Sequence, residues 1–171
     1  MNEIDLNSQN KPILIDSSGI LVKYGFDKVP IVINYSTLKK VFLKHGIPKE
    51  DLILLKEQID NNLLIASSLT RADSIILFIG QWDFKNRPIM IALNLEKMIN
   101  EEPVYKITSI YGRDNFERFI QRLFDEKKII YYNEDAHLWF KILGYNVPKN
   151  VVADDTDYKG KYFVSLCILK N

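Results

Sequence analysis

The chain has 171 residues, 47% of them hydrophobic, and its 23 Lys and Arg residues nearly balance 22 Asp and Glu residues, for a formal charge of +1. This length suits one well-buried core with terminal additions and is short for two domains. A charge so close to zero excludes a global field that would attract nucleic acid or an anionic membrane, so any such affinity must be local.

The amino-terminal stretch MNEIDLNSQNKPILID is polar and acidic, whereas a signal peptide needs a basic region followed by an apolar run. The longest apolar runs, such as SIILFIG, are too short to span a bilayer as helices. The single cysteine, Cys167, has no partner for an internal disulfide, and its apolar surroundings favour a buried side chain over a nucleophile. We therefore expect a cytoplasmic protein without a membrane partner.

In chain order, residues 1–29 are typical of an irregular or weakly paired arm. A short extended piece then leads to a helix that starts at the Asn-Tyr-Ser-Thr stretch, and the sequence HGIP separates it from a second helix. The apolar stripe of the first helix recurs at three-and-four spacing and ends with His45.

Four strand candidates follow, separated only by the polar connectors LTRA, KN and KMINEEP. Short connectors between consecutive strands favour hairpins over parallel crossovers. The pattern therefore predicts an α+β fold in which N-terminal helices pack on a four-stranded antiparallel meander sheet. The predicted strands are residues 63–68, 73–84, 87–96 and 104–112.

Beyond Gly112, residues 113–128 show helical spacing with a capping-type start at Asp114. A second helix is predicted at residues 133–145, and the tail is expected to be a polar loop and a last strand. Without repeats or linkers, we expect one compact domain. Its parts are an N-terminal arm (1–29), a main domain (30–149) and a C-terminal loop and strand (150–171).

The sequence predicts neither a metal site nor a cofactor. It has two His and one Cys, and no HExxH or CxxC motif. The acidic stretch VADDTDYKG lacks the ligand pattern of a calcium loop. The seven glycines are scattered singly, so no glycine-rich loop is present to bind the phosphates of a nucleotide.

A sparse polar set remains that could work without a cofactor. A metal-independent ribonuclease needs little more, because RNA supplies its own nucleophile in the 2'-hydroxyl. The protein must supply a proton-transfer group and donors for the phosphate, and histidine is the side chain that titrates near neutrality. The candidates are His45, Arg71, Ser67 or Ser68, Asn94, Ser109 and Tyr111.

Each candidate also has a purely structural explanation. His45 in the last turn of a helix would interact favourably with the helix dipole. Arg71 could be a solvated residue of a hairpin turn, and Ser109 and Tyr111 are common in any sheet. His137 lies near the start of its helix beside Leu-Trp-Phe, which indicates packing rather than catalysis.

The order of the elements resembles the phage-associated branch of the barnase, EndoU, colicin and RelE (BECR) nuclease superfold, as found in phage polyvalent and MuF-type proteins. The resemblance covers roughly residues 30–149. The stretches that carry it are STLKKVFLKHGI, PKEDLILLKEQIDNN, LLIASSLTRADSIILFIGQWDFKNRPIMIALNLE, YKITSIYGRDNFERFI and KKIIYYNEDAHLWFKILGYNVPK.

The resemblance implies His45 in FLKHGI as the catalytic acid or base, with Ser109 and Tyr111 orienting the scissile phosphate. It implies RNA cleavage to a 2',3'-cyclic phosphate on the concave sheet face, in the cytoplasm of a host bacterial cell. Where related helices often read Arg-His, this chain has Lys44 before the histidine. The implied substrate-binding residues are Lys44, Ser68, Arg71 and Asn94.

Three functions are therefore open. The first is a phage or toxin-type endoribonuclease with an RNA substrate and a cognate inhibitor. The second is a catalytically silent binding module that occupies a host protein or RNA. The third is an immunity or structural partner that pairs a sheet edge through YFVSLCIL.

Overall fold

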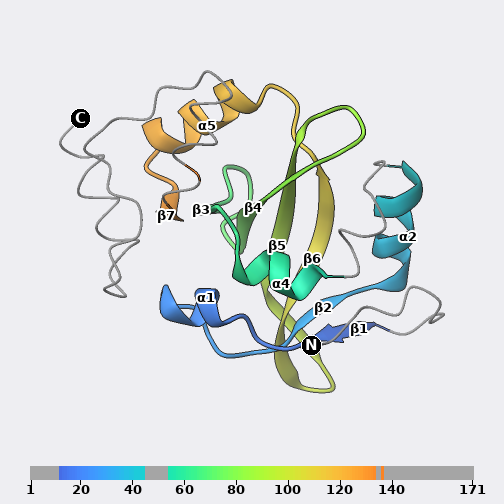
Figure 1. The fold of residues 1–171 in the computed structure, drawn as a ribbon. Helices are drawn as coiled ribbons and strands as arrows, with labels where there is room; N and C mark the ends of the chain where they lie inside the picture. Colours follow the sequence, from blue (N-terminus) through green and yellow to red (C-terminus); the bar gives the residue numbers. More distant parts are fainter. Residues whose placement is uncertain (1–11, 45–53, 134–135, 137–171) are drawn as a thin grey trace.

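The computed structural model describes residues 12–44, 54–133 and 136. Within these ranges the chain forms four helices and seven strands, and all seven strands join one sheet (Figure 1). None of these helices is long and apolar enough to cross a membrane. The helices are α1 (Gly19–Lys23), α2 (Tyr35–Lys44), α4 (Leu55–Asp60) and α5 (Phe116–Asp125). The strands are β1 (Ile13–Ile15), β2 (Ile31–Ile33), β3 (Leu64–Ser67), β4 (Ser74–Trp82), β5 (Pro88–Ile99), β6 (Glu102–Gly112) and β7 (Ile129–Tyr132).

The sheet is mixed, with its strands in the order β1-β2-β6-β5-β4-β3-β7. Neighbouring strands are antiparallel except for β2 and β6, which run parallel. Tight turns connect the long central strands. Asn86 (φ 57°) lies between β4 and β5, and Asn100 (φ 51°) lies between β5 and β6; asparagine tolerates this left-handed conformation better than most residues.

The predicted fold, with N-terminal helices on a four-stranded antiparallel meander, is wrong. The sheet has seven strands because β1 and β2 extend it beyond β6, and β7 extends it beyond β3. These added strands have three, three and four residues; β2 coincides with the short extended piece predicted before the first helix, but the sequence does not predict its place in the sheet. The strands β2 and β7 pair with β6 and β3, which lie far away along the chain, and the parallel pairing of β2 with β6 requires a crossover that adjacent segments do not reveal.

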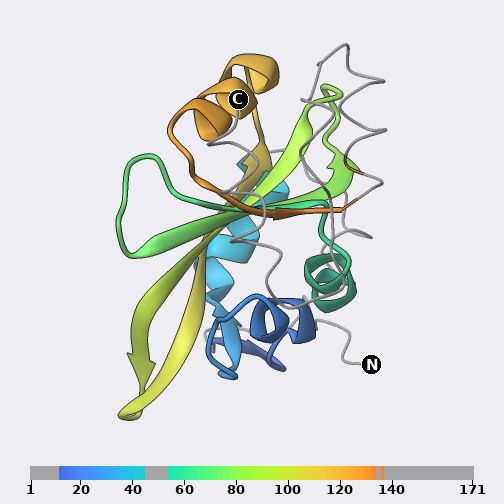
Figure 2. The same ribbon diagram turned by 90° about the vertical axis from the view of Figure 1, so that its left-hand side faces the viewer.

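The central strands are buried on both faces, so the sheet separates two cores. On one face, which we call the α4 face, Ile65 and Leu77 pack with residues of α1, α2 and α4. On the other, the α5 face, Leu64 and Phe78 pack against α5. Consecutive residues of a strand point to opposite faces, which explains this division. Figure 2 shows α5 on one side of the sheet and α1 with α4 on the other.

Helix α5 covers only part of its face. Phe78 of β4 meets Phe116 and Phe119 edge-on, with ring centroids 5.1 and 6.1 Å apart. Farther along β6, Thr108 is exposed and Ser109 is half-buried. The residues that α5 turns toward the sheet recur at helical spacing and are Phe116, Phe119, Ile120, Leu123 and Phe124.

The start of α5 differs from the prediction. The N-cap is Asn115, which has a left-handed backbone (φ 51°) and makes no side-chain capping bond. Asp114, the predicted cap, instead accepts a hydrogen bond from Arg87 Nη1 at 3.1 Å. The Asp114 carboxylate therefore links the start of α5 to the β4–β5 hairpin.

The segment expected to be an irregular arm contains β1 and α1 within residues 12–29. Leu21 and Tyr24 are buried in the core of the α4 face, and the Tyr24 ring lies 4.2 Å from that of Tyr131. Ser18 caps α1 and donates to Asp60 Oδ1 at 2.7 Å, which joins α1 to the end of α4. Apart from Asn133 and Ala136, the predicted second C-terminal helix lies outside the described residues, as does the last strand.

Candidate functional site

Strand β6 carries a row of polar side chains along the α5 face. In the antiparallel register, Ser109 lies opposite Ala92 and Tyr111 opposite Met90. Met90 belongs to the core beneath α5, and both Ala92 and Tyr111 pack against that core. Directly opposed residues share a face, so both hydroxyl side chains belong to the α5 face.

A β-bulge brings a lysine into the same row. The register shifts between Ala92 and Leu93, so Thr108 is an extra residue on β6. Its Oγ1 approaches the carbonyl oxygen of Ala92 at 3.4 Å. Because of this insertion, Lys106, opposite Asn94, lies on the same face as Ser109 although they are three residues apart.

The row continues past the end of β6. The backbone N–H of Arg113 donates to the carbonyl oxygen of Pro88 at 2.8 Å, which extends the ladder by one residue. The guanidinium of Arg113 stacks over the Phe119 ring, 4.0 Å from its centroid. Its Nη1 is 3.5 Å from the Tyr111 hydroxyl. We call Lys106, Ser109, Tyr111 and Arg113 the β6 row.

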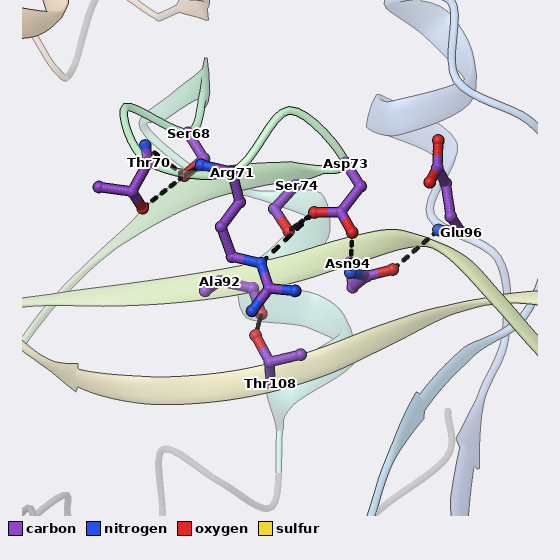
Figure 3. A network of polar contacts seen from close by, with 9 residues as sticks. All are labelled: Ser68, Thr70, Arg71, Asp73, Ser74, Ala92, Asn94, Glu96 and Thr108. Carbon is purple, nitrogen blue, oxygen red and sulfur yellow. Dashed lines mark hydrogen bonds and ion pairs between the residues drawn. The ribbon is translucent and has the colours of Figure 1, made fainter.

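A second polar group lies at the entrance to β4 (Figure 3). Asp73 is its centre: Asn94 Nδ2 donates to one carboxylate oxygen at 2.9 Å and Ser74 Oγ to the other at 3.0 Å. Arg71 Nε lies 3.5 Å from the same carboxylate. Hydrogen bonds from Asn94, then Ser74, hold the pKa of Asp73 below its usual range, and the charge of Arg71 acts in the same direction.

The turn before β4 positions Arg71. Ser68 Oγ accepts hydrogen bonds from the backbone N–H groups of Thr70 and Arg71, both at 3.2 Å, in a local side-chain turn. The side chain of Arg71 is 66% exposed and points across β5 toward Ala92 and Thr108 (Figure 3). We call Ser68, Arg71, Asp73 and Asn94 the Arg71 network.

Of the predicted substrate-binding residues, the structure therefore brings Ser68, Arg71 and Asn94 together. The two predicted hydroxyls belong to the same face, and Ala92, the partner of Ser109, lies on β5 between the network and β6. Asn94 is 1% exposed, so it supports Asp73 rather than presenting its amide to a ligand.

Two predicted residues, His45 and Lys44, cannot be compared with this site. His45 lies outside the described residues, and Lys44 is the last residue of α2, its side chain likewise outside them. Two other residues of α2, Leu38 and Val41, pack into the core of the α4 face. The proton-transfer partner of the hydroxyls thus stays a prediction.

Sequence reasoning missed Lys106, Thr108 and Arg113. Lys106 and Arg113 carry charges at the ends of the stretch KITSIYGR, and simple alternation would place Lys106 and Ser109 on opposite faces. The bulge at Thr108 places Lys106 and Ser109 on the same face, and no pattern in the local sequence predicts this bulge.

A pocket of about 550 Å³ lies where β6 passes into α5. Arg87 lines this pocket, and its Nε donates to the buried carboxylate of Asp83 at 2.7 Å. Two backbone N–H groups donate to the same carboxylate at 2.9 Å. Burial alone would raise the pKa of Asp83, but the bonds from Arg87 and Lys85 and the charge of Arg87 outweigh it, so the pKa is lowered. Gly112 leaves room for this arrangement, because a Cβ there would fall against Asp83 Oδ2.

The β6 row and the Arg71 network together can bind anions. The β6 row and Arg71 offer cationic and hydroxyl donors, which suit phosphate oxygens. Both histidines lie outside the described residues, so proton transfer near neutral pH cannot be assigned to a described imidazole. In the part of the chain that the structure describes, no cluster of His, Cys, Asp and Glu side chains is suited to hold a metal ion.

Comparison with protein families matches residues 36–136 to the phage MuF-C-terminal domain. The comparisons with curated proteins and with solved structures found no match. The matched region runs from α2 to just beyond β7 and contains both the Arg71 network and the β6 row. It supports the phage part of the resemblance noted in the sequence and does not extend to the BECR nuclease superfold.

Proposed function

This chain belongs to the phage MuF-C-terminal domain family, and we propose, from the geometry of its sheet, that it binds RNA on the α5 face and cleaves it without a metal ion. The observation that carries the proposal is the shared face of the β6 row and the Arg71 network. The proposed setting is the cytoplasm of a host bacterium, with a cognate inhibitor as a further partner.

The charges on this face support RNA binding. Lys106 and Arg113 have no carboxylate partner among the described residues, and Arg71 is only weakly engaged, at 3.5 Å from Asp73. Unpaired cations release counterions from a phosphate backbone, which supplies most sequence-independent affinity. A local row of this kind explains how a chain of formal charge +1 could bind a polyanion.

Cleavage would proceed by transesterification. The 2'-oxygen attacks phosphorus, the bond from phosphorus to the 5'-oxygen breaks, and a 2',3'-cyclic phosphate and a 5'-hydroxyl result. His45 is the proposed proton-transfer group, removing the 2'-hydroxyl proton or delivering one to the leaving oxygen. Ser109 and Tyr111 orient the phosphate, while Arg71 or Lys44 stabilises the charge that grows on it.

A test uses the full chain, end-labelled single-stranded RNA and excess chelator. The proposal expects products ending in a 2',3'-cyclic phosphate and no cleavage where the 2'-hydroxyl is replaced by hydrogen. His45→Ala should abolish cleavage, and Arg71→Ala should lower kcat/KM by about 100-fold because it removes a donor to the developing charge. Arg122→Ala, which removes an equal charge from the exposed side of α5, should have little effect.

Full cleavage by the His45→Ala protein would remove His45 from the mechanism. Absence of both cleavage and RNA binding in the wild-type protein would overturn the proposal.

A binding module without catalysis is the second candidate. The observation that favours it is the position of α2, whose Leu38 and Val41 pack into the α4 face while the hydroxyls of β6 lie on the α5 face. Such a module would occupy a host RNA or host protein. RNA binding that depends on Arg71, without cleavage under any metal or chelator condition, would support this candidate over the nuclease.

A further inference from the structure

The pocket at the start of α5 lies at the end of the β6 row. Its volume of about 550 Å³ falls in the range typical of small-molecule sites. The side chains that line it come from the β4–β5 hairpin, from the residues after β6 and from the first turn of α5. Those that matter here are Trp82, Arg87, Arg113, Phe116, Glu117 and Arg118.

The three arginines of the pocket differ in how far their charge is neutralised. Arg87 is paired with Asp83 at 2.7 Å and with Asp114 at 3.1 Å. Arg113 and Arg118 have no ion pair with any carboxylate in the described part of the chain. Asp114 and Glu117 also line the pocket and offset part of this charge, so among the described residues the positive charge without an ion-pair partner is local to Arg113 and Arg118.

Arg113 is held in position, but its hydrogen-bonding capacity is not filled. Its guanidinium stacks on Phe119, and its Nη1 makes only a long contact of 3.5 Å to the Tyr111 hydroxyl. The buried Nε has no hydrogen-bond partner. The terminal nitrogens of a guanidinium that stacking holds in place are suited to bind a phosphate oxygen, because little side-chain freedom is lost on binding.

The pocket also offers an aromatic surface beside these charges. Trp82 is half-buried and lines it together with Phe116. Bases of single-stranded nucleic acid stack on such side chains while cations hold the adjacent phosphate. Four residues of extended chain, from Ser109 to Arg113, span about 13 Å, so a strand of RNA bound along β6 could reach the pocket.

We propose that this pocket binds one nucleotide of single-stranded RNA, with the base toward Trp82 and the phosphate toward Arg113 and Arg118. The inference deepens the proposed function and rests on it for the identity of the polymer. A mononucleotide is the minimal ligand, so the pocket can be examined separately from RNA binding and cleavage.

The test measures fluorescence quenching of Trp82 by adenosine 5'-monophosphate in the full chain carrying Trp139→Phe, which leaves Trp82 as the reporter. Adenosine without phosphate is the ligand control. Arg118→Ala should weaken binding of the monophosphate about tenfold, as expected for a charge-assisted hydrogen bond. Arg122→Ala is the matched control, because it removes the same charge from the same helix but lies outside the pocket.

The same variants are compared in binding of a labelled ten-nucleotide RNA over a range of salt concentrations. Arg118→Ala should reduce the slope of log affinity against log salt by about 0.7, the value for one phosphate contact with a single strand. Arg122→Ala should leave the slope unchanged.

The two proposals fail in different ways. If RNA binds but the monophosphate does not quench Trp82, or if Arg118→Ala and Arg122→Ala behave alike, the pocket proposal is overturned while the proposed function stands. If the monophosphate binds in an Arg118-dependent manner but RNA neither binds nor is cleaved, the pocket stands as a nucleotide site and the proposed function fails.

Discussion

Among single residues, Asp83 connects the stability of the β4–β5 hairpin to the pocket. Its side chain is 1% exposed and receives the guanidinium of Arg87, which also reaches Asp114. Arg87 in turn lines the pocket. Through Arg87, the buried carboxylate of Asp83 is therefore linked to Asp114, just before the start of α5.

Asp83→Asn should lower the free energy of unfolding by about 1–3 kcal/mol, because the buried donors of Arg87 lose a charged acceptor. The pKa of Asp83 is lowered in the folded protein, so its contribution is present above the unfolded-state value of about 4 and is lost as pH falls through the folded-state pKa. Urea unfolding at several pH values should show the wild-type advantage shrinking below about pH 4. An advantage that stays constant down to strongly acidic pH would contradict this account.

Gly112 leaves room for the side chains of Asp83 and Arg87. A Cβ at this position would fall against Asp83 Oδ2 and lie 2.9 Å from Arg87 Cβ, so Gly112→Ala should destabilise the protein by about 1–3 kcal/mol through overpacking. Gly19→Ala is the control: it starts α1 and its Cβ would meet nothing within 4 Å. Thermal unfolding should separate the two variants, and equal melting temperatures would show that Gly112 is not constrained.

The sequence predicts those residues of the candidate site that are close neighbours along the chain. Arg71 and Ser68 share one turn, and Ser109 and Tyr111 share one strand, so chain neighbourhood indicates them. Their meeting on one face depends on pairing between β4, β5 and β6. Arg113 and Trp82 meet at the pocket through tertiary structure, which no local pattern reveals.

At the scale of elements, β6 organises the site because one strand presents the whole row. It is bordered by β5 on one side and by the parallel β2 on the other. The bulge at Thr108 sets which side chains share the α5 face. Pairing with β5 along its length, and with β2 at residues 105–107, holds the side chains of β6 in register, which is what an extended ligand requires.

Lys106→Ala should weaken RNA binding several-fold and reduce the salt slope by about 0.7, because this lysine belongs to the row. Lys28→Ala removes an equal charge from the exposed loop before β2 and should leave both quantities unchanged. Fluorescence anisotropy with a short labelled RNA provides the measurement. Equal losses for the two lysines would indicate attraction by net charge alone.

The predictability of the elements follows from their length. The strands β4, β5 and β6 have nine to twelve residues and lie where apolar runs between polar turns predicted strands. Helix α5 has five buried residues at regular spacing, and its position also agrees with the sequence. In contrast, β2 and β7 are short strands whose partners β6 and β3 are distant in sequence, and β1 joins the sheet through β2; this tertiary effect made the predicted architecture wrong.

At the scale of the whole molecule, one sheet separates two cores, and the β6 row and the Arg71 network lie on the α5 face. Three helices contribute to the core of the α4 face, while α5 alone among the described helices packs on the other. Among the described residues, this unequal distribution of helices leaves the polar side chains of β6 beside α5. This asymmetry makes the central claim testable, because a ligand of the site must contact the α5 face.

Photo-crosslinking of RNA containing 4-thiouridine, followed by mass spectrometry of the crosslinked peptides, tests that claim most directly. Crosslinks should concentrate in peptides containing residues 68–73 and 106–113, with a further set at Trp82 if the pocket is occupied. They should disappear when Arg71 and Lys106 are both replaced by Ala. Crosslinks confined to α1 and α4, on the opposite side of the sheet, would contradict the account.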